Sequence, residues 1–222
     1  MSQHMFKDLS AYPWTKNFTS NFIGIKSELN AIINLPLREL NENTWAGERP
    51  NYLDTSFHKN QAWKTYTFRF FGIDHVPNCK SCPLIYNLIK DIPDLVTVEF
   101  SMLEPDTHIL PHRGYTDLVL RSHLGLIVPE GDLGLRVGDE TRKWAEGEMI
   151  MFNDAAEHEA WNKTNERRVV LMMDFVNPDC GMTGKEVAQK IISETTDSHV
   201  LNIAPREHWL NWIEEGQFPL EV

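Results

Sequence analysis

The stretch ILPHRGYTDLVLRSHLGLIVP, residues 109–129, joins two histidines to a long apolar run. Pro111 stands directly before His112, and because proline lacks the amide hydrogen that a helix interior needs, this segment is not expected to be helical. Arg121 and His123 stand two residues apart within the apolar run. Since side chains alternate between the two faces of a strand, we expect Arg121 and His123 to point to the same side of one β-strand.

Similar short runs flank this stretch on both sides. The segment WKTYTFRFFG, residues 63–72, alternates and is rich in aromatic residues, which predicts a strand. Further β-like runs are separated by clusters of Gly, Pro, Asp and Asn: residues 96–102, 107–110, 118–128, 133–137, 141–144, 148–152, 157–161 and 167–176. Short strands at such regular spacing predict a mainly β fold, namely a sandwich, a jelly roll or a barrel.

Helices are predicted before this β-rich core and within it. The segment SNFIGIKSELNAII predicts a helix capped by Ser20, and residues 35–62 are polar and irregular. The segment CPLIYNLIKDIP predicts a short helix that stops near Pro93. The region 1–62 is therefore expected to be helical or irregular and to pack on the core.

The region after the core is also expected to be helical. The segment TGKEVAQKIISE begins with Thr183 and Glu186, which have the spacing of a capping box, so we expect a helix that packs on the sheet. The tryptophan-rich segment REHWLNWIEEGQF either forms a helix or covers an opening. With a β-core of about residues 63–178 and a C-terminal region of 179–222, the sequence predicts one domain over residues 1–222.

Composition limits the classes of partner. The chain has 222 residues and a net charge of −11, whereas nucleic-acid binders usually show a basic face. No apolar segment approaches the roughly 20 residues that span a bilayer. The first residues, MSQHMFKDLS, lack the basic start and apolar run of a signal peptide. We therefore expect a cytoplasmic protein with no nucleic-acid and no membrane partner; the sequence leaves the oligomeric state open.

The cysteines do not indicate a metal site. Cys79 and Cys82 form a C-x-x-C pattern, but no second pair follows, so a structural zinc site would lack half of its ligands. We expect these cysteines to be free thiols in a tight turn.

Another histidine and another arginine add to the candidate site residues. His158 begins a predicted strand after the acidic turn FNDAAEHE, and Arg168 lies ten residues later in the next predicted strand. A hairpin joining these strands would bring the two side chains together. Two histidines on strand edges and an inward arginine suit a metal that holds a dicarboxylate. A histidine in a β-run can equally be a hydrogen-bonded core residue, so spacing alone leaves both interpretations open.

Linked motifs carry a more specific resemblance. They are WKTYTFRFFG, FSMLEPDTHILPHRG, LRSHLGLIVP, LRVGDETRKWAEGEMIMFNDAAEHEAWN and RVVLMMDF, and they run from residue 63 to about residue 178. Together they resemble the aspartyl/asparaginyl β-hydroxylase family of Fe(II)- and 2-oxoglutarate-dependent oxygenases, in particular its soluble bacterial members. The resemblance implies a double-stranded β-helix (a cupin-like jelly roll) with flanking helices at both termini. It also implies a hydroxylase that uses Fe(II), 2-oxoglutarate and O2.

The resemblance assigns the metal ligands. It implies that His112 and His158 are the protein ligands of iron and that Gly114 stands where related iron sites carry an acid. On this basis we expect Gly114→Asp to be structurally tolerable, to tighten Fe(II) binding and to lower activity. The same open position would suit chloride, so an iron halogenase is an alternative function. A non-catalytic binding protein of cupin-like architecture is another.

The resemblance also assigns the cosubstrate site. It implies that Arg168 pairs with the far carboxylate of 2-oxoglutarate, with Ser101 as hydroxyl partner, and that His123 contacts the carboxylate near the metal. Trp63 would lie along the cosubstrate. Arg121 would contact either 2-oxoglutarate or an acidic group of the substrate.

The same strand carries a neighbouring arginine, Arg167. Alternation lets only one of Arg167 and Arg168 face inward, and the resemblance selects Arg168. The substrate is expected to be a small molecule or peptide: an amino acid, an aspartyl or asparaginyl residue, or a metabolite derived from an amino acid. Related bacterial enzymes that act on lipid A acyl chains carry hydrophobic anchors, so the lack of such a segment disfavours a lipid substrate.

Overall fold

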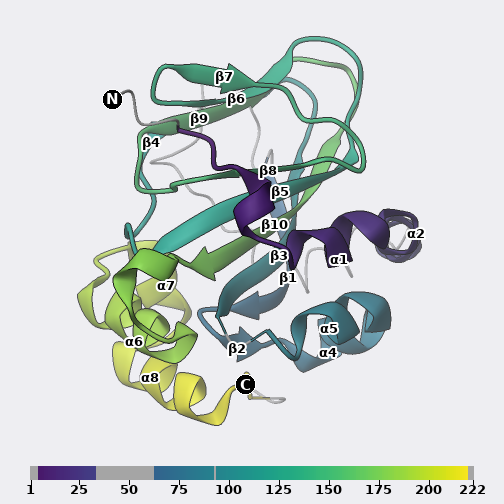
Figure 1. The fold of residues 1–222 in the computed structure, drawn as a ribbon. Helices are drawn as coiled ribbons and strands as arrows, with labels where there is room; N and C mark the ends of the chain where they lie inside the picture. The colour runs from purple at the N-terminus through teal and green to yellow at the C-terminus, as the bar shows by residue number, and fades with distance from the viewer. Residues whose placement is uncertain (1–4, 34–62, 93, 220–222) are drawn as a thin grey trace.

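Two antiparallel β-sheets form the centre of the computed structural model, which describes residues 5–33, 63–92 and 94–219 (Figure 1). The larger sheet has the strand order β2-β1-β3-β10-β5-β8, and the smaller has the order β4-β9-β6-β7. The strands are β1 Trp63–Phe70, β2 Ile73–Asp74, β3 Leu95–Leu103, β4 Thr107–His112, β5 Val119–Ile127, β6 Leu133–Val137, β7 Glu140–Arg142, β8 Met149–Phe152, β9 His158–Asn162 and β10 Arg168–Val176. The predicted mainly β, jelly-roll architecture is confirmed.

Helices flank these sheets on the N-terminal and C-terminal sides, as predicted. They are η1 Leu9–Ala11, α1 Thr15–Ser20, α2 Phe22–Ile33, α4 Val76–Ser81, α5 Pro83–Ile89, η2 Pro178–Cys180, α6 Gly184–Glu194, α7 Ser198–Ile203 and α8 Arg206–Glu215. None of the helices in the described ranges combines the length and apolar character needed to cross a bilayer. The interpretation of residues 35–62 as irregular falls outside the described residues.

The outer face of the larger sheet packs against α1, α2, α4 and α5. Alternate residues of neighbouring strands, among them Phe68, Phe100 and Leu171, are fully buried there against Leu29 and Ile85. Burial of such large apolar side chains contributes about 1.5–3 kcal/mol each. Because this face carries the main apolar core, the opposite face of the same strands is available for polar side chains.

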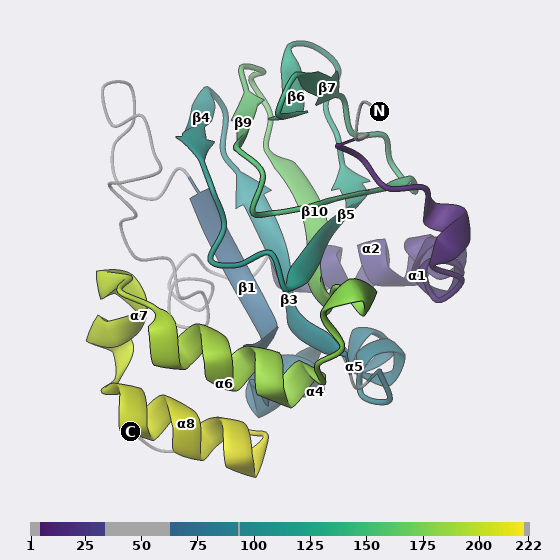
Figure 2. The ribbon, with the colours of Figure 1, turned by 60° about the vertical axis from the view of Figure 1, so that its left-hand side comes forward.

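The C-terminal helices cover one end of the larger sheet. Figure 2 shows α6 and α8 side by side near β1 and β3, and Trp209 of α8 is fully buried in their shared apolar cluster. The predicted capping box is confirmed, because the Thr183 hydroxyl accepts from the Glu186 amide while the Glu186 carboxylate accepts from the Thr183 amide. The tryptophan-rich segment is helical in α8, which settles that alternative.

Two local predictions are wrong. Ser20 does not cap the second helix, because it is the last residue of α1, and the Asn21 carbonyl accepts the first hydrogen bond of α2 from the amide of Ile25. The C-x-x-C segment is not a tight turn. Cys79 lies within α4 and Cys82 connects α4 to α5; both are free thiols, as expected, and both are buried.

The expected hairpin between the strands of His158 and Arg168 is also wrong. Strand β9 pairs with β4 and β6 in the smaller sheet, whereas β10 pairs with β3 and β5 in the larger sheet. The chain therefore crosses from one sheet to the other between these strands. The two residues face a common space between the sheets, and that space holds the site.

Candidate active site

His112 and His158 lie side by side at the edge of the space between the sheets. They are direct partners in the pairing of β4 with β9, after a β-bulge that begins at Ile109, and their ring centroids are 4.2 Å apart. His158 is buried, and His112 is partly buried. Antiparallel pairing thus brings together two histidines that are 46 positions apart (158 − 112) in the sequence.

Backbone carbonyls fix the orientation of both imidazoles. Nδ1 of His112 lies 2.7 Å from the Leu110 carbonyl oxygen, and Nδ1 of His158 lies 2.9 Å from the Ala156 carbonyl oxygen. A carbonyl can only accept, so in the neutral ring each Nδ1 carries the proton and each Nε2 carries the lone pair. Burial lowers the pKa of each histidine to about 4. Both rings are therefore neutral at pH 7, which is the form that binds metals.

A cavity of about 340 Å³ adjoins the histidine pair between the sheets. It brings together all of the side chains that the sequence analysis singled out for metal and cosubstrate binding. These residues are Trp63, Ser101, His112, Arg121, His123, His158 and Arg168. We call it the inner cavity. Their common location is observed; the role of each in binding stays a prediction.

Arg168 brings a buried positive charge to the lining of the inner cavity. Its side chain is 1% exposed, its Nη1 donates to the Ser101 carbonyl oxygen (3.2 Å), and its guanidinium lies 4.5 Å from the ring centroid of Trp144. Within the described ranges no acidic side chain forms an ion pair with it, and burial lowers its pKa to about 9. A buried cation of this kind favours an anionic ligand.

His123 presents a hydrogen-bond donor to the same cavity. Its Nδ1 accepts from the indole Nε1 of Trp144 at 3.2 Å, so the neutral ring carries its proton on Nε2. That Nε2 is buried and has no hydrogen-bond partner among the described residues. Burial and the nearby charges of Arg168 and Arg121 hold the pKa of His123 well below its usual range. In addition to the cation of Arg168, the inner cavity thus contains an unsatisfied N–H donor that suits an anion.

Two carboxylates that the sequence analysis missed engage Arg121. Its Nε and Nη2 donate to the two oxygens of Asp174 at 2.8 and 2.9 Å, and its Nη1 lies 2.7 Å from Asp154 Oδ1. Asp174 follows the alternation of β10, but its strand is apolar on both faces, so periodicity gave no signal. Asp154 lies in the connection between β8 and β9, where no periodicity applies.

Asp154 also corrects the expectation for Gly114. The Gly114 amide donates to the Asp154 carbonyl oxygen at 2.8 Å, and a Cβ at Gly114 would overlap the Asp154 carboxylate. Gly114 has no positive φ, so the need for glycine here is spatial. Gly114→Asp is therefore not tolerable without displacement of Asp154, and the space beside Gly114 is filled by this carboxylate.

We expect Gly114→Ala to destabilise the protein by about 1–3 kcal/mol, because the new methyl group overpacks against the buried Asp154. The test is a double-mutant cycle with Asp154→Ala, which removes the overlapping atoms, followed by chemical unfolding of all four proteins. Gly114→Ala should cost less in the Asp154→Ala background than in the wild type. Equal costs in both backgrounds would show that the overlap is not the cause.

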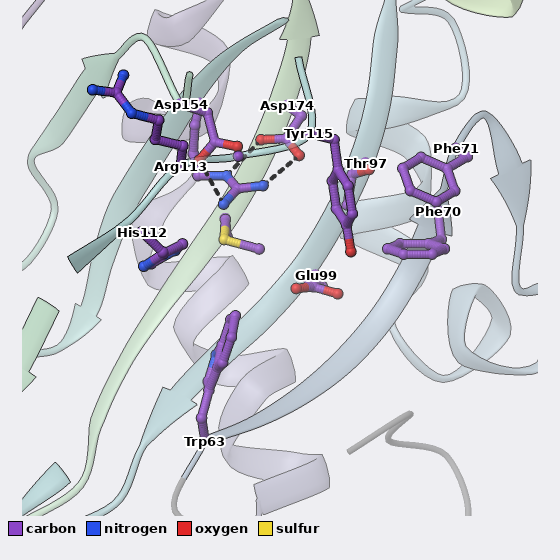
Figure 3. Close-up of a pocket in the computed structure, with 13 residues that line it drawn as sticks. Trp63, Phe70, Phe71, Thr97, Glu99, His112, Arg113, Tyr115, Asp154 and Asp174 are labelled. Atoms are coloured by element: carbon purple, nitrogen blue, oxygen red, sulfur yellow. Dashed lines mark hydrogen bonds and ion pairs between the residues drawn. The ribbon is translucent and has the colours of Figure 1, made fainter. Parts of the chain in front are cut away.

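A second cavity of about 530 Å³ lies beside His112 (Figure 3). We call it the outer cavity. It shares part of its wall with the inner cavity and adds aromatic and acidic side chains. Its lining consists of Trp63, Phe70, Phe71, Thr97, Glu99, His112, Arg113, Gly114, Tyr115, Arg121, Asp154, Met172 and Asp174. A molecule held there would lie next to His112.

Comparison with known proteins places these features in context. Residues 19–178 match the protein family described as aspartyl/asparaginyl beta-hydroxylase. A protein of Rhizobium tropici named ornithine lipid ester-linked acyl 2-hydroxylase is 38% identical over 178 residues, covering 77% of this chain and 60% of that protein. The human aspartyl/asparaginyl beta-hydroxylase is 30% identical over 131 residues, covering 57% of this chain and 17% of that protein. This chain thus spans less than two thirds of either relative.

Similarity to solved structures is weaker. The crystal structure of an oxidoreductase of the 2OG-Fe(II) oxygenase family from Burkholderia pseudomallei aligns with a TM-score of 0.40 and 12% sequence identity. The alignment covers 52% of this chain and 69% of that one.

Proposed function

Because this chain belongs to the aspartyl/asparaginyl β-hydroxylase family, we propose that it is an Fe(II)- and 2-oxoglutarate-dependent dioxygenase that hydroxylates an unactivated carbon. One observation carries this proposal: two neutral imidazoles share a cavity with the buried cation of Arg168, which has no acidic partner in the described part of the chain. The cavity therefore offers both ligands for a metal and a counter-charge for a carboxylate.

The residues fit a divalent metal ion. Nε2 of His158 lies 3.3 Å from Asp154 Oδ1, so the nearby carboxylate would favour a cation bound at the histidine pair through its negative charge. No three His, Cys, Asp or Glu side chains in the described ranges are grouped to hold a metal. His112 and His158, whose neutral rings carry the proton on Nδ1, would be the protein ligands. Bound iron, 2-oxoglutarate and O2 would supply the oxidising chemistry.

The chain's own residues would bind and orient the cosubstrate. Arg168 would neutralise one carboxylate of 2-oxoglutarate, and the Nε2–H of His123 would donate to the other. The indole Nε1 of Trp63 donates to the Ser101 hydroxyl at 3.0 Å, and this hydrogen bond orients both side chains in the wall of the inner cavity. A carboxylate that pairs with a buried guanidinium gains a charge-assisted hydrogen bond and excludes water from the cavity.

The halogenase alternative is less well supported than a hydroxylase. Asp154 places a carboxylate beside the histidine pair, and its negative charge opposes chloride binding there, which disfavours a halogenase. The substrate classes remain an amino acid, an aspartyl or asparaginyl residue, or a related metabolite. The similarity to the Rhizobium protein adds the acyl chain of a lipid, which the sequence analysis had disfavoured. A cytoplasmic location without nucleic-acid or membrane partners stays a prediction.

The proposed function is tested by succinate formation. We expect the purified protein to convert 2-oxoglutarate to succinate when Fe(II) and O2 are present, at a slow rate without substrate and a faster rate with one. Controls lack metal or contain Zn(II), which has no redox chemistry. Succinate at the level of the metal-free control, together with no binding of 2-oxoglutarate, would favour a non-catalytic cupin-like binding protein instead.

A further inference from the structure

Trp144 stands behind the two groups that would bind the carboxylates of the cosubstrate. It lies in the connection between β7 and β8, it is 5% exposed, and it lines neither the inner nor the outer cavity. Its indole contacts both His123 and Arg168, which do line the inner cavity. A residue in this place can influence a bound molecule only through those two side chains.

The indole N–H of Trp144 decides which nitrogen of His123 is a donor. Nε1 of Trp144 lies 3.2 Å from Nδ1 of His123, and an indole nitrogen can only donate. Nδ1 must therefore accept, which leaves the proton of the neutral ring on Nε2. Nε2 is buried and has no hydrogen-bond partner among the described residues. Without the indole, no described residue would hold the proton on one nitrogen rather than the other.

The orientation of the His123 ring depends on the same contact. The imidazole packs against the indole of Trp144, with centroids 6.1 Å apart, and edge-on against Phe152, with centroids 5.4 Å apart. A ring flip would exchange Nδ1 and Nε2 and would break the hydrogen bond to Trp144. Trp144 therefore holds both the direction of the ring and the position of its proton.

The face of the same indole supports the guanidinium of Arg168. The central carbon of the guanidinium lies 4.5 Å from the ring centroid, which is within the range of a cation–π interaction. Nη1 donates to the Ser101 carbonyl oxygen at 3.2 Å, and Nε has no hydrogen-bond partner in the described ranges. An aromatic face stabilises a cation without neutralising it, so the charge of Arg168 is kept for an anionic ligand.

Gly125 explains how the indole reaches both groups. It follows His123 by two residues on β5, and the connection that carries Trp144 runs against it: the Gly147 amide donates to the Gly125 carbonyl oxygen, and the Gly125 amide donates to the Glu148 carbonyl oxygen, both at 3.0 Å. A Cβ at Gly125 would lie 2.2 Å from the Ala145 carbonyl oxygen. Only glycine allows this close approach of the two backbones.

We propose that Trp144 is a positioning residue for the cosubstrate: its N–H holds His123 in the Nε2–H tautomer, and its ring face holds the guanidinium of Arg168. The inference rests on the proposed function, because it takes 2-oxoglutarate as the molecule that these two groups bind. It deepens that function by assigning a role to a side chain that touches neither cavity.

The first test reads the tautomer of His123 directly. Trp144→Phe removes the N–H and keeps an aromatic ring. Trp161→Phe is the matched control, because Trp161 also donates through its indole Nε1, to Asp132 at 2.7 Å, and lines neither cavity. Nitrogen–proton correlation spectra of metal-free protein with isotope-labelled histidine are recorded at a pH of about 8, where imidazoles are neutral. His123→Gln identifies the signals of His123.

Wild type and Trp161→Phe should show His123 wholly in the Nε2–H form. Trp144→Phe should show a mixture of the two tautomers or the Nδ1–H form. A merely structural role of Trp144 would not change the position of this proton. A His123 that stays wholly in the Nε2–H form in Trp144→Phe therefore overturns the inference.

The second test measures the dissociation constant of 2-oxoglutarate by calorimetry on the full chain loaded with Mn(II). Trp144→Phe should weaken binding about 3- to 10-fold, the range that one neutral hydrogen bond supports, and Trp161→Phe should leave it unchanged. In a His123→Ala background, Trp144→Phe should weaken binding less than about twofold, because the lost N–H acts through His123. Equal losses in the two backgrounds would contradict that route.

Trp144→Leu tests the ring face, because it removes the contact with Arg168 as well. Even in the His123→Ala background it should weaken 2-oxoglutarate binding at least about 3-fold. Thermal unfolding shows whether each variant is folded, and Trp144→Phe keeps the test open if Trp144→Leu is not. A folded Trp144→Leu that has no effect in this background refutes the role of the ring face.

Affinity of the wild type separates this inference from the proposed function. If the wild type binds 2-oxoglutarate but neither the tautomer nor the affinity depends on Trp144, the positioning role is wrong and the proposed function stands. If the wild type binds no 2-oxoglutarate, the proposed function fails and the role of Trp144 at the cosubstrate fails with it, whatever the tautomer of His123.

Discussion

Replacing either His112 or His158 by alanine should abolish Fe(II)-dependent succinate formation. Only these two side chains would hold the ion, so the loss of one removes half of the protein's ligands. Each imidazole is already neutral and held by a carbonyl at Nδ1, so little rearrangement compensates for the missing Nε2. Single-turnover and steady-state succinate assays, with Fe(II) raised to saturation, measure the effect.

His108→Ala is the matched control for this prediction. His108 lies on the same strand, β4, but its Nε2 contacts Glu159 at 2.7 Å, and it lines neither cavity. Its removal should leave turnover near that of the wild type. Thermal unfolding should show that all three variants are folded. Near-normal activity in either His112→Ala or His158→Ala would refute the two-histidine assignment.

Arg168→Ala should raise the 2-oxoglutarate concentration needed for half-maximal turnover by a factor of about 30 to several thousand. The factor corresponds to about 2–5 kcal/mol, the usual cost of removing one partner of a buried charge pair. The Arg168 side chain is almost completely buried, and no acidic side chain in the described residues pairs with it. Its positive charge would therefore be available to a carboxylate of the cosubstrate. The dissociation constant of 2-oxoglutarate, measured with Mn(II), should rise in parallel.

Arg167→Ala provides the adjacent comparison. Arg167 points away from the cavity and forms an ion pair with Glu104, which also pairs with Lys64 at 3.1 Å. This partly exposed network contributes up to about 1 kcal/mol, so Arg167→Ala should lower stability slightly and leave 2-oxoglutarate binding unchanged. The opposite ranking of the two arginine variants would mean that the inward-facing residue of β10 is not Arg168.

Several properties of this protein could be predicted from sequence because they depend on neighbouring residues. The strands follow from short alternating runs between turn residues, and the capping box of α6 follows from Thr183 and Glu186. The common face of Arg121 and His123 follows from their spacing of two. The choice of Arg168 over Arg167 needed the family resemblance, because both faces of β10 are apolar.

Pairing between strands could not be predicted in the same way. His158 and Arg168 are ten positions apart and suggest a hairpin, but β9 and β10 belong to opposite sheets. Alternation determines which residues of a strand share a face, while the partner strand depends on contacts across the whole chain. The short connection between β9 and β10 is compatible with either arrangement, and only the closed fold selects one.

The sequence by itself predicted the mainly β class, and the family resemblance that it carries selected the two histidines and the arginine that share the inner cavity. The tertiary structure alone decided what surrounds them: Asp154 fills the space beside Gly114, Asp174 holds Arg121, and Glu99 lines the outer cavity. Each of these acids looks like an ordinary polar residue in the sequence. A carboxylate becomes part of a site only when two sheets close over it and exclude water, because its charge then acts across a low dielectric on groups that are distant along the chain.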